Sequence, residues 1–240
     1  MKIKIKYFFI FLISNTMYSG FLSSEESGKH LFIFSGQSNM ARFKADLWFT
    51  PQISKVFGED NTIVSFHAQG GQSISKWYRQ WKSSDGETDP QSGKIYDTMI
   101  DATKAKIEGK KIKTVTFIWM QGEADSKAQN SDVYLASLNG LKRQLEQDFE
   151  RNDINFVIGR LSDSGFYRRR DNKRVGNPHW EEIRRAQQTF ADASPRALWI
   201  DTDDLNGEKQ ELHLTKPEGY SKLGERYVEA VTNLVKNKLR

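Results

Sequence analysis

The chain has 240 residues and contains no cysteine. This absence excludes disulfide bonds, zinc sites built on thiolates and a cysteine nucleophile. It also argues against lipid attachment to a cysteine near the N-terminus. The sequence carries no internal repeat and no low-complexity tract. Its length, with 37% hydrophobic residues, predicts a single domain that buries a sizeable core.

The sequence also lacks an apolar run long enough to span a bilayer. The apolar run at 7–13 follows three lysines within residues 1–6 and precedes small and polar residues. This arrangement is typical of a secretory signal peptide. We therefore expect residues 1–24 to be a signal peptide, with cleavage between about residues 19 and 26. The protein is then secreted or periplasmic, with no stable membrane insertion after signal removal.

Little net charge is left once this segment is removed. The formal net charge of the whole chain is +5, and the leader carries three of the lysines. A domain near neutral has no general attraction for nucleic acid or membranes, so we expect neither as a partner. The basic segment 167–174 is the exception. As a loop beside the site it suits a carboxylated sugar or a polyanion, and a solvated basic loop is the simpler interpretation.

Short apolar runs alternate with helical patterns after the leader. Strands are predicted at 31–34, 62–68, 115–120, 156–161 and 197–201. Apolar residues at helical spacing predict helices over 134–149 and 180–190, and a last helix opens with a capping box at 215–218. Strands that alternate with helices predict an α/β fold, with a parallel sheet covered on both faces, in one domain over residues 28–240.

A serine follows the first predicted strand. This strand breaks at Gly36 and runs into a predicted helix start, which places the Ser38 hydroxyl at the carboxyl edge of the sheet. A serine hydroxyl needs a base within hydrogen-bond reach to act as a nucleophile. His213 follows the last strand and is expected at the same edge. The remaining histidines precede the first strand, lie inside the second or open a helix: His30, His67 and His179.

Further polar segments follow strands and are expected at the same edge. They are 68–73, 120–125 and 211–214. A serine, a close pair of glycines, an amide and a histidine on one rim are the groups that acyl transfer needs. Simpler interpretations exist for two of these features. Gly70 and Gly71 suit an ordinary turn, and Glu123 and Asp125 suit the N-terminus of a helix.

Together these segments resemble the SGNH hydrolase superfamily, in its branch of carbohydrate O-acetylesterases that includes sialate O-acetylesterase-like and acetylxylan esterase-like proteins. The resemblance covers residues 31–227. It lies in the blocks GQSNM at 36–40, GG at 70–71, WMQGEAD at 119–125, RRAQ at 184–187 and HLTKPEGYSKLGERY at 213–227. It implies a three-layer α/β/α sandwich with a five-stranded parallel sheet, a flavodoxin-like fold. It also implies an acetylated carbohydrate as substrate and catalysis without a metal or cofactor.

The resemblance assigns roles within these blocks. Ser38 is the expected nucleophile and His213 the expected base. The backbone N–H groups of Ser38 and Gly71, with the side chain of Gln121, are the expected oxyanion hole. The expected substrate-binding residues are Gln37, Asn39, Gly70, Glu123 and Trp77. Tyr78 is a second aromatic for stacking on a sugar, although Trp77 and Tyr78 equally suit a core or a groove wall.

The sequence departs from the superfamily pattern at two positions. Ala124 stands where many members carry an asparagine donor, which makes Gln121 the nearest amide. Gln210 stands where members usually carry the aspartate that orients the histidine. Glu211 is the expected substitute, and the aspartates at 203–204 are weaker ones. The alternative is a Ser-His dyad in which a backbone carbonyl of the loop accepts the imidazole proton.

The expected function is therefore a secreted serine esterase that removes O-acetyl groups from sialic acid or from a xylan-type glycan. The two departures motivate an alternative, a non-catalytic carbohydrate-binding protein on a degenerate esterase scaffold. Release of acetate distinguishes the two. The oligomeric state is left open by the sequence.

Overall fold

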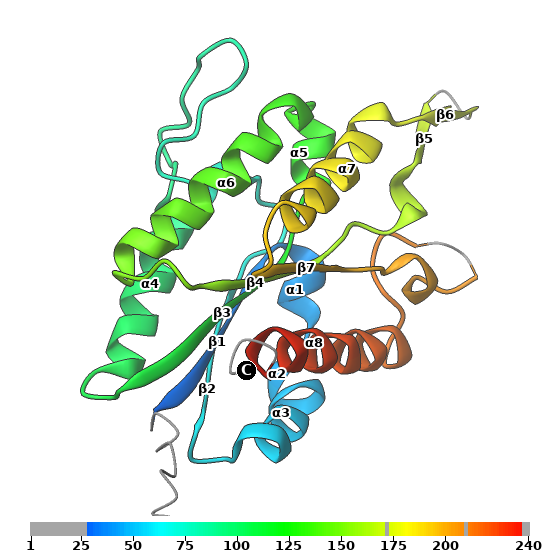
Figure 1. The fold of residues 1–240 in the computed structure, drawn as a ribbon. Coiled ribbons are helices and arrows are strands. Elements are labelled where there is room, and N and C mark those ends of the chain that lie inside the picture. Colours follow the sequence, from blue (N-terminus) through cyan, green and yellow to red (C-terminus); the bar gives the residue numbers. More distant parts are fainter. Residues whose placement is uncertain (1–27, 171–172, 209–210, 237–240) are drawn as a thin grey trace, which may run out of the picture.

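A computed structural model describes residues 28–170, 173–208 and 211–236 of the protein (Figure 1). Five parallel strands form the central sheet in the order β2–β1–β3–β4–β7. The strands are β1 (Lys29–Gly36), β2 (Thr62–Ala68), β3 (Ile112–Met120), β4 (Asn155–Gly159) and β7 (Ala197–Ile200). All five predicted strands are present, which confirms the α/β fold with a five-stranded parallel sheet.

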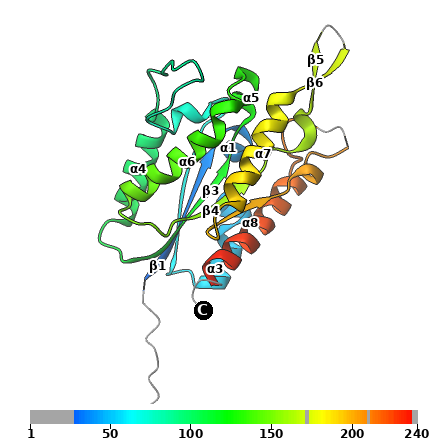
Figure 2. The ribbon, with the colours of Figure 1, turned by 45° about the horizontal axis from the view of Figure 1, so that its top comes forward.

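Helices cover both faces of this sheet (Figures 1 and 2). One face carries α4 (Lys94–Ile107), α5 (Glu123–Ala128), α6 (Ser131–Asp148) and α7 (Pro178–Asp192). The other carries α1 (Ser38–Arg42), α2 (Ala45–Trp48), α3 (Thr50–Phe57) and α8 (Glu218–Lys236). The helices predicted at 134–149 and 180–190 are α6 and α7, so these predictions are confirmed. Short 3₁₀ helices lie in the loops: η1 (Ile74–Lys76), η2 (Asp163–Gly165) and η3 (Asp203–Leu205).

Alternation of side chains along the strands explains the three layers. In β1, Leu31 and Ile33 join the core under α4, α6 and α7. Phe32 and Phe34 join the separate core under α3 and α8. Because successive side chains of a strand point to opposite faces, both faces of this sheet are apolar. Each face therefore needs its own layer of helices.

The segment expected to be a basic loop forms an antiparallel hairpin of β5 (Tyr167–Arg170) and β6 (Lys173–Gly176). The hairpin projects outward from the body of the molecule (Figures 1 and 2). The hypothesis that its arginines reach the site concerns side chains outside the described part of the structure. The predicted signal peptide at 1–24 also lies outside the described residues.

Several boundaries differ from the prediction by a few residues, among them the starts of β1 and α8. His30 lies within β1, because this strand begins at Lys29 and not at Leu31. The last helix begins at Glu218, and the hydroxyl of Thr215 accepts the N–H of Gly219 at 3.1 Å. The predicted cap is therefore present, but the regular helix starts after it. Over the described ranges, every helix is too short or too polar to serve as a membrane span.

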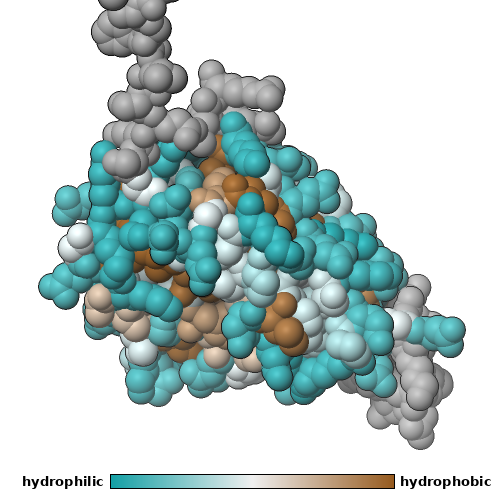
Figure 3. Space-filling view, turned by 90° about the horizontal axis from the view of Figure 1, so that it is seen from below, coloured by the Kyte–Doolittle hydropathy of each residue, from teal (hydrophilic) through white to brown (hydrophobic). Residues whose placement is uncertain are grey.

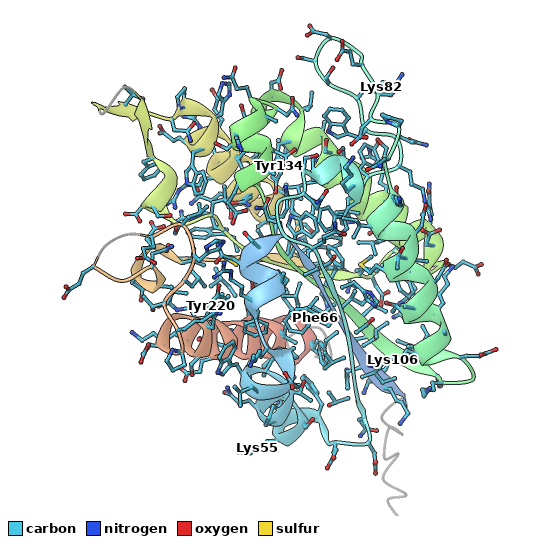
Figure 4. All side chains as sticks on the ribbon, turned by 180° about the vertical axis from the view of Figure 1, so that it is seen from behind. Lys55, Phe66, Lys82, Lys106, Tyr134 and Tyr220 are labelled. Atoms are coloured by element: carbon cyan, nitrogen blue, oxygen red, sulfur yellow. The ribbon has the colours of Figure 1, made fainter. Side chains whose placement is uncertain are left out.

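Polar groups protect the exposed edge of the sheet. The ammonium group of Lys106, on α4, donates to the carbonyl oxygen of Val64 in the edge strand β2 at 2.6 Å (Figure 4). A charged side chain that covers an edge strand in this way hinders pairing with a strand of another chain. The face seen from below is mainly hydrophilic, and its apolar patches are separated by polar side chains (Figure 3).

A close approach of β1 to β3 determines where the site begins. Gly36, the last residue of β1, has a φ of 144°, and a Cβ atom there would lie 2.0 Å from the carbonyl oxygen of Met120. The N–H of Gln37 donates to that same oxygen at 3.0 Å. Only glycine fits this position. The chain therefore turns sharply out of β1 and presents Ser38 at the carboxyl edge.

Substitution Gly36→Ala is expected to lower the free energy of unfolding by at least about 3 kcal/mol, because it adds overlap with Met120 to a strained backbone. Gly176→Ala is the matched control. No atom lies within 4 Å of the Cβ added at Gly176, so its effect is expected to stay within about 0.5 kcal/mol. Urea unfolding followed by tryptophan fluorescence measures both. Equal stabilities of the two variants would contradict the close approach.

Candidate active site

Ser38 lies at the carboxyl edge of β1 and is half-buried. As the first residue of α1, it has an N–H without an acceptor inside the helix. Gly70, in the loop after β2, lies against it: a Cβ atom at Gly70 would be 3.7 Å from the Cβ atom of Ser38. The glycine loop and the end of β1 therefore meet, as the parallel sheet predicts.

His213 lies in the loop before α8 and is also half-buried. The side chain of Asn39 bonds this loop at two points. Its Nδ2 donates to the carbonyl oxygen of Leu212 at 3.2 Å, and its Oδ1 accepts the N–H of Leu214 at 3.2 Å. The residue after Ser38 thus holds both peptide groups that flank His213. Asn39 therefore joins the start of α1 to the loop that carries His213. Within the described residues, no hydrogen bond links Ser38 Oγ to the imidazole itself.

The surroundings of His213 favour the neutral form of its imidazole. Burial lowers the pKa of His213, and the positive charges of Arg42 and Lys216 lower it further, against a smaller opposing effect of Glu211. A neutral imidazole can accept the proton of a serine hydroxyl. Glu211 is exposed, and its backbone carbonyl accepts a hydrogen bond from the side chain of Asn206.

The aspartates at 203–204, the weaker candidates for orienting the histidine, are paired elsewhere. Asp203 accepts from both terminal nitrogens of Arg184, at 2.6 and 2.9 Å. Asp204 accepts two hydrogen bonds of 2.7 Å from Arg226. Gln210 lies outside the described residues. Glu211 therefore stays the predicted orienting acid, with the dyad as its alternative.

Gln121 lies in the floor of the site, instead of facing it as an oxyanion donor. Its side chain is fully buried. Its Nε2 faces three acceptors, which are Asp125 Oδ2, the carbonyl oxygen of Gln72 at 2.9 Å and Oε1 of Gln37 at 3.2 Å. The hydroxyl of Tyr134 donates to Gln121 Oε1 at 3.0 Å. An amide nitrogen has two hydrogens, so this geometry leaves the backbone N–H groups of Ser38 and Gly71 as the expected donors to an oxyanion.

Gly71 has a φ of 72°, and no atom lies within 4 Å of its Cβ position. A positive φ is typical of a turn, so the simpler interpretation of the glycine pair is correct for the backbone. The functional interpretation is compatible with it, because the neighbouring Gly70 contacts Ser38. Gly71 therefore stands exposed beside the predicted nucleophile.

The two aromatic residues expected to stack on a sugar lie away from the site. Trp77 is fully buried, its indole N–H donates to Ser35 Oγ at 2.8 Å, and its ring packs edge-on against Trp119 at 5.1 Å. The ring of Tyr78 lies against the backbone of Gly140 on α6. Trp77 is thus a core residue, and the assignment of Trp77 to substrate binding is corrected by its burial.

Two buried carboxyl groups lie at the start of α5. Glu123 accepts from Asn39 Nδ2 at 3.1 Å, and Asp125 accepts the N–H of Ile74 at 2.9 Å. The second oxygens, Glu123 Oε2 and Asp125 Oδ1, are buried without a hydrogen-bond partner among the described residues. Burial raises the pKa of each carboxyl to about 7. Both acids are in the first turn, as the simpler interpretation predicts, but they are buried and not solvated.

Buried residues that the sequence analysis did not single out support this floor. Gln187 on α7 donates to the carbonyl oxygen of Gln121 at 2.8 Å and accepts the N–H of Leu161 at 2.9 Å. The hydroxyl of Tyr220 donates to Asn39 Oδ1 at 3.1 Å. Both residues belong to blocks that carry the family resemblance, RRAQ and HLTKPEGYSKLGERY. The family resemblance therefore pointed to these two residues, but the sequence did not indicate their role.

A cavity of about 580 Å³ adjoins His213. Its lining includes Arg42, Asn206, Glu211, Lys216 and Glu218. Its size and its mixture of charges suit a small polar ligand. A second cavity, of about 460 Å³, lies at the carboxyl end of β2 and is bordered by Gln69 and Gln72 of the glycine loop.

A second group of serine, histidine and carboxylate lies between α6 and α7. Ser131 Oγ lies 2.7 Å from His179 Nδ1 and donates to Glu182. Both partners bind the hydroxyl here, whereas a catalytic triad has its carboxylate on the far side of the imidazole. This group joins the first turns of two helices, so His179 has a structural role here.

Comparisons with known proteins agree with this fold. A family model described as carbohydrate esterase, sialic acid-specific acetylesterase, matches residues 42–233. A search of curated proteins finds no match. A solved structure from Arabidopsis thaliana has a TM-score of 0.64 and 19% identity over 87% of this chain and 100% of its own.

Two solved esterases are also similar. A carbohydrate acetylesterase from Xanthomonas citri has a TM-score of 0.61 and 15% identity over 86% of this chain and 56% of its own. An acetyl xylan esterase has a TM-score of 0.54 and 11% identity over 84% of this chain and 99% of its own. At these identities the structural likeness shows a shared fold.

Substitution Asp203→Ala is expected to destabilise the protein more than Asp204→Ala. Asp203 neutralises Arg184, whose side chain is 9% exposed, and its removal leaves a buried cation at a cost of more than about 2 kcal/mol. Asp204 pairs with Arg226, whose side chain is 32% exposed, and its removal costs about 1 kcal/mol or less. Urea unfolding of both variants measures the difference, and similar losses would speak against the buried pair.

Stability is expected to fall as the pH rises through about 7, because folded Glu123 keeps its proton above the ordinary carboxyl pKa of 4.5. Substitution Glu123→Gln mimics the protonated form. It should reduce this fall by an amount on the order of 2 to 3 kcal/mol, with Asp125 accounting for the rest. Urea unfolding at about pH 5 and about pH 8 tests the expectation. Glu218→Gln, at an exposed carboxyl, is the control, and an unchanged pH dependence in Glu123→Gln would refute the assignment.

Proposed function

Because the chain belongs to the sialic acid-specific acetylesterase family of carbohydrate esterases, we propose that it removes O-acetyl groups from a carbohydrate through Ser38 and His213. Family membership makes the protein a carboxylic ester hydrolase. One observation carries the proposed mechanism. The two hydrogen bonds from Asn39 to the peptide groups around His213 support a position of the imidazole next to Ser38.

The reaction uses each group in turn. Ser38 Oγ attacks the acetyl carbonyl carbon while the neutral imidazole of His213 takes the hydroxyl proton. The N–H groups of Ser38 and Gly71 donate to the carbonyl oxygen as it becomes negative. His213 then gives its proton to the sugar oxygen, the ester bond breaks, and acetyl-Ser38 remains. A water that loses its proton to His213 releases acetate, and Ser38 regains its hydrogen.

The leaving sugar lies on the side of His213, because the imidazole has to reach the sugar oxygen in order to protonate it. The cavity of about 580 Å³ beside His213 supports this placement. Arg42 and Lys216 suit a carboxylated sugar such as sialic acid, and the carboxylates and the Asn206 amide in the same lining suit the hydroxyls of a neutral glycan. Sialic acid and xylan-type glycan are both substrates to be tested.

The proposed location is the periplasm or the exterior of the cell. The support is the sequence of residues 1–24, with its lysines and its apolar core at 7–13. An exported esterase of this kind would act on extracellular or cell-surface acetylated glycan.

The purified protein is expected to hydrolyse p-nitrophenyl acetate and to release acetate from an acetylated glycan. Ser38→Ala and His213→Ala should each lower kcat/KM by at least about 10³-fold, because each removes a group that acts in the chemical step. Ser131→Ala and His179→Ala are matched controls from the second serine–histidine pair, and they should stay near wild type. Full activity of Ser38→Ala would rule out the mechanism.

A panel of acetylated sialic acids, xylan and mannan, assayed for released acetate, identifies the sugar in the same experiment. Release from the sialic acids alone would assign the acidic sugar, and release from xylan alone the neutral glycan. Binding of acetylated glycan by wild-type protein without any acetate release would favour the carbohydrate-binding alternative instead.

A further inference from the structure

We propose that Asn39 and Glu123 are positioning residues that hold the His213 loop against Ser38, and that they act on the peptide groups of the loop instead of on the imidazole. The inference rests on the proposed esterase function. It changes the role of both residues, which the sequence analysis expected to bind substrate.

Asn39 uses every hydrogen-bonding position of its side chain. Nδ2 donates to the Leu212 carbonyl oxygen at 3.2 Å and to Glu123 Oε1 at 3.1 Å. Oδ1 accepts from the Leu214 N–H at 3.2 Å and from the hydroxyl of Tyr220 at 3.1 Å. The residue is 3% exposed. A buried amide has two donor hydrogens and two acceptor positions, so no capacity remains for a sugar hydroxyl.

These four hydrogen bonds also determine the orientation of the amide. A rotation by half a turn would place the Nδ2 hydrogens against the Leu214 N–H and the oxygen against the Leu212 carbonyl. Both contacts would be repulsive. The side chain is therefore bound in one orientation, and it connects α1, α5, α8 and the His213 loop. Tyr220, the contribution of α8, is labelled in Figure 4, close to α1.

The His213 loop is also bound at its two ends, where the Glu211 carbonyl accepts from the side chain of Asn206 and Leu214 is buried in the core under α3 and α8. Between these ends Leu212 is 47% exposed, so Asn39 supplies the hydrogen bonds to the peptide groups that flank the imidazole. The bonds at Leu212 and Leu214 leave mainly the side-chain torsions of His213 free. A general base has to remain within hydrogen-bond reach of the nucleophile, and small misplacements are costly.

Glu123 binds the second hydrogen of the Asn39 amide. Its Oε1 accepts that hydrogen at 3.1 Å and can do so in either protonation state, because a proton can sit on Oε2, and this contact fixes the direction of Nδ2. The other oxygen, Glu123 Oε2, is buried without a partner among the described residues. A buried carboxyl with an unpaired oxygen is unfavourable for folding. An unfavourable group of this kind beside the predicted active site is typical of residues kept for function.

Substitution Asn39→Ala is expected to lower kcat by about 100-fold, with KM changed by less than about 3-fold, because it loosens the base and removes no contact with the sugar. Asn177→Ala is the matched control. Asn177 also donates two hydrogen bonds between segments, to Ser126 Oγ at 3.1 Å and to the Gly165 carbonyl at 3.2 Å, but it does not bind the His213 loop. Its kcat should stay within about 3-fold of wild type.

The acid limb of the pH profile gives a second readout. Burial holds the pKa of His213 below its ordinary value. A loop released by Asn39→Ala moves His213 toward solvent, which raises that pKa. The acid limb of kcat/KM should therefore shift to higher pH in Asn39→Ala and stay in place in Asn177→Ala.

Hydrogen exchange tests the hydrogen bonds between Asn39 and the His213 loop without any substrate. The Leu214 N–H is protected in wild type by Asn39 Oδ1, and in Asn39→Ala its exchange should accelerate by at least about 10-fold. The N–H of Phe117, in the middle of β3, should exchange at the same slow rate in both proteins. A merely structural role of Asn39, without a link to the loop, would change both amides or neither.

Exchanging the hydrogen-bond donor and acceptor between positions 39 and 123 tests the contribution of Glu123. Asn39→Asp keeps the size of the side chain, removes the donor and places two carboxyl groups together, so kcat should fall. Adding Glu123→Gln to Asn39→Asp supplies a donor from the opposite side and should recover part of that loss. Tyr220→Phe serves if Asn39→Ala does not fold, because it removes one hydrogen bond to Asn39 and keeps the ring stacked on Trp48. Its kcat should fall several-fold.

The outcomes distinguish this inference from the proposed function. A wild-type protein that hydrolyses none of the acetyl esters overturns both. An active wild type whose Asn39→Ala variant keeps its kcat, or whose Leu214 exchange does not change, overturns the inference and leaves the esterase function standing. An active wild type with a kcat loss confined to the Asn39 variants, with faster Leu214 exchange, supports it.

Discussion

The contact between the end of β1 and the end of β3 determines where the rest of the site lies. Gly36 and Met120 face each other in neighbouring parallel strands, too close for a side chain on Gly36. The chain has to leave the sheet directly after Gly36, at the same edge where the residues after Met120 leave it. Ser38 and the acidic start of α5 are therefore neighbours although 84 residues separate Asn39 from Glu123.

A layer of buried polar side chains lies under this edge and gives the site its rigidity. Gln121 is bound by the end of β1, the loop after β2, α6 and α7 through Gln37, Gln72, Tyr134 and Gln187. Buried amides are costly unless they are paired, so a network of this kind tolerates one arrangement of its members. The catalytic groups proposed above lie on the outer side of this layer, with the proposed oxyanion donors, the backbone N–H groups of Ser38 and Gly71.

Much of the fold could be predicted because its signals are local. An apolar run bounded by turn residues, such as 31–34, identifies a buried strand, and helical spacing of apolar residues identifies α6 and α7. The hairpin of β5 and β6 could not be predicted in this way, because a run of arginines has no alternation of polar and apolar residues. Trp77 shows the same limit at the site. An aromatic residue after a glycine pair suits a sugar platform or a core, and only its packing on Trp119 decides for the core.

The sequence by itself determined the order of the five sheet strands and of α6, α7 and α8, and hence the expectation that Ser38 and His213 belong to the same edge of the sheet. Only the tertiary structure decided which polar residues of those short blocks face outward. Asn39 and Gln121 stand in the same blocks as the predicted catalytic and oxyanion groups, yet both point inward. Periodicity follows from hydrogen bonds between near neighbours, whereas the direction of a polar side chain depends on partners from distant segments. For Asn39 those partners lie 84 and 173 residues away, at Glu123 and Leu212.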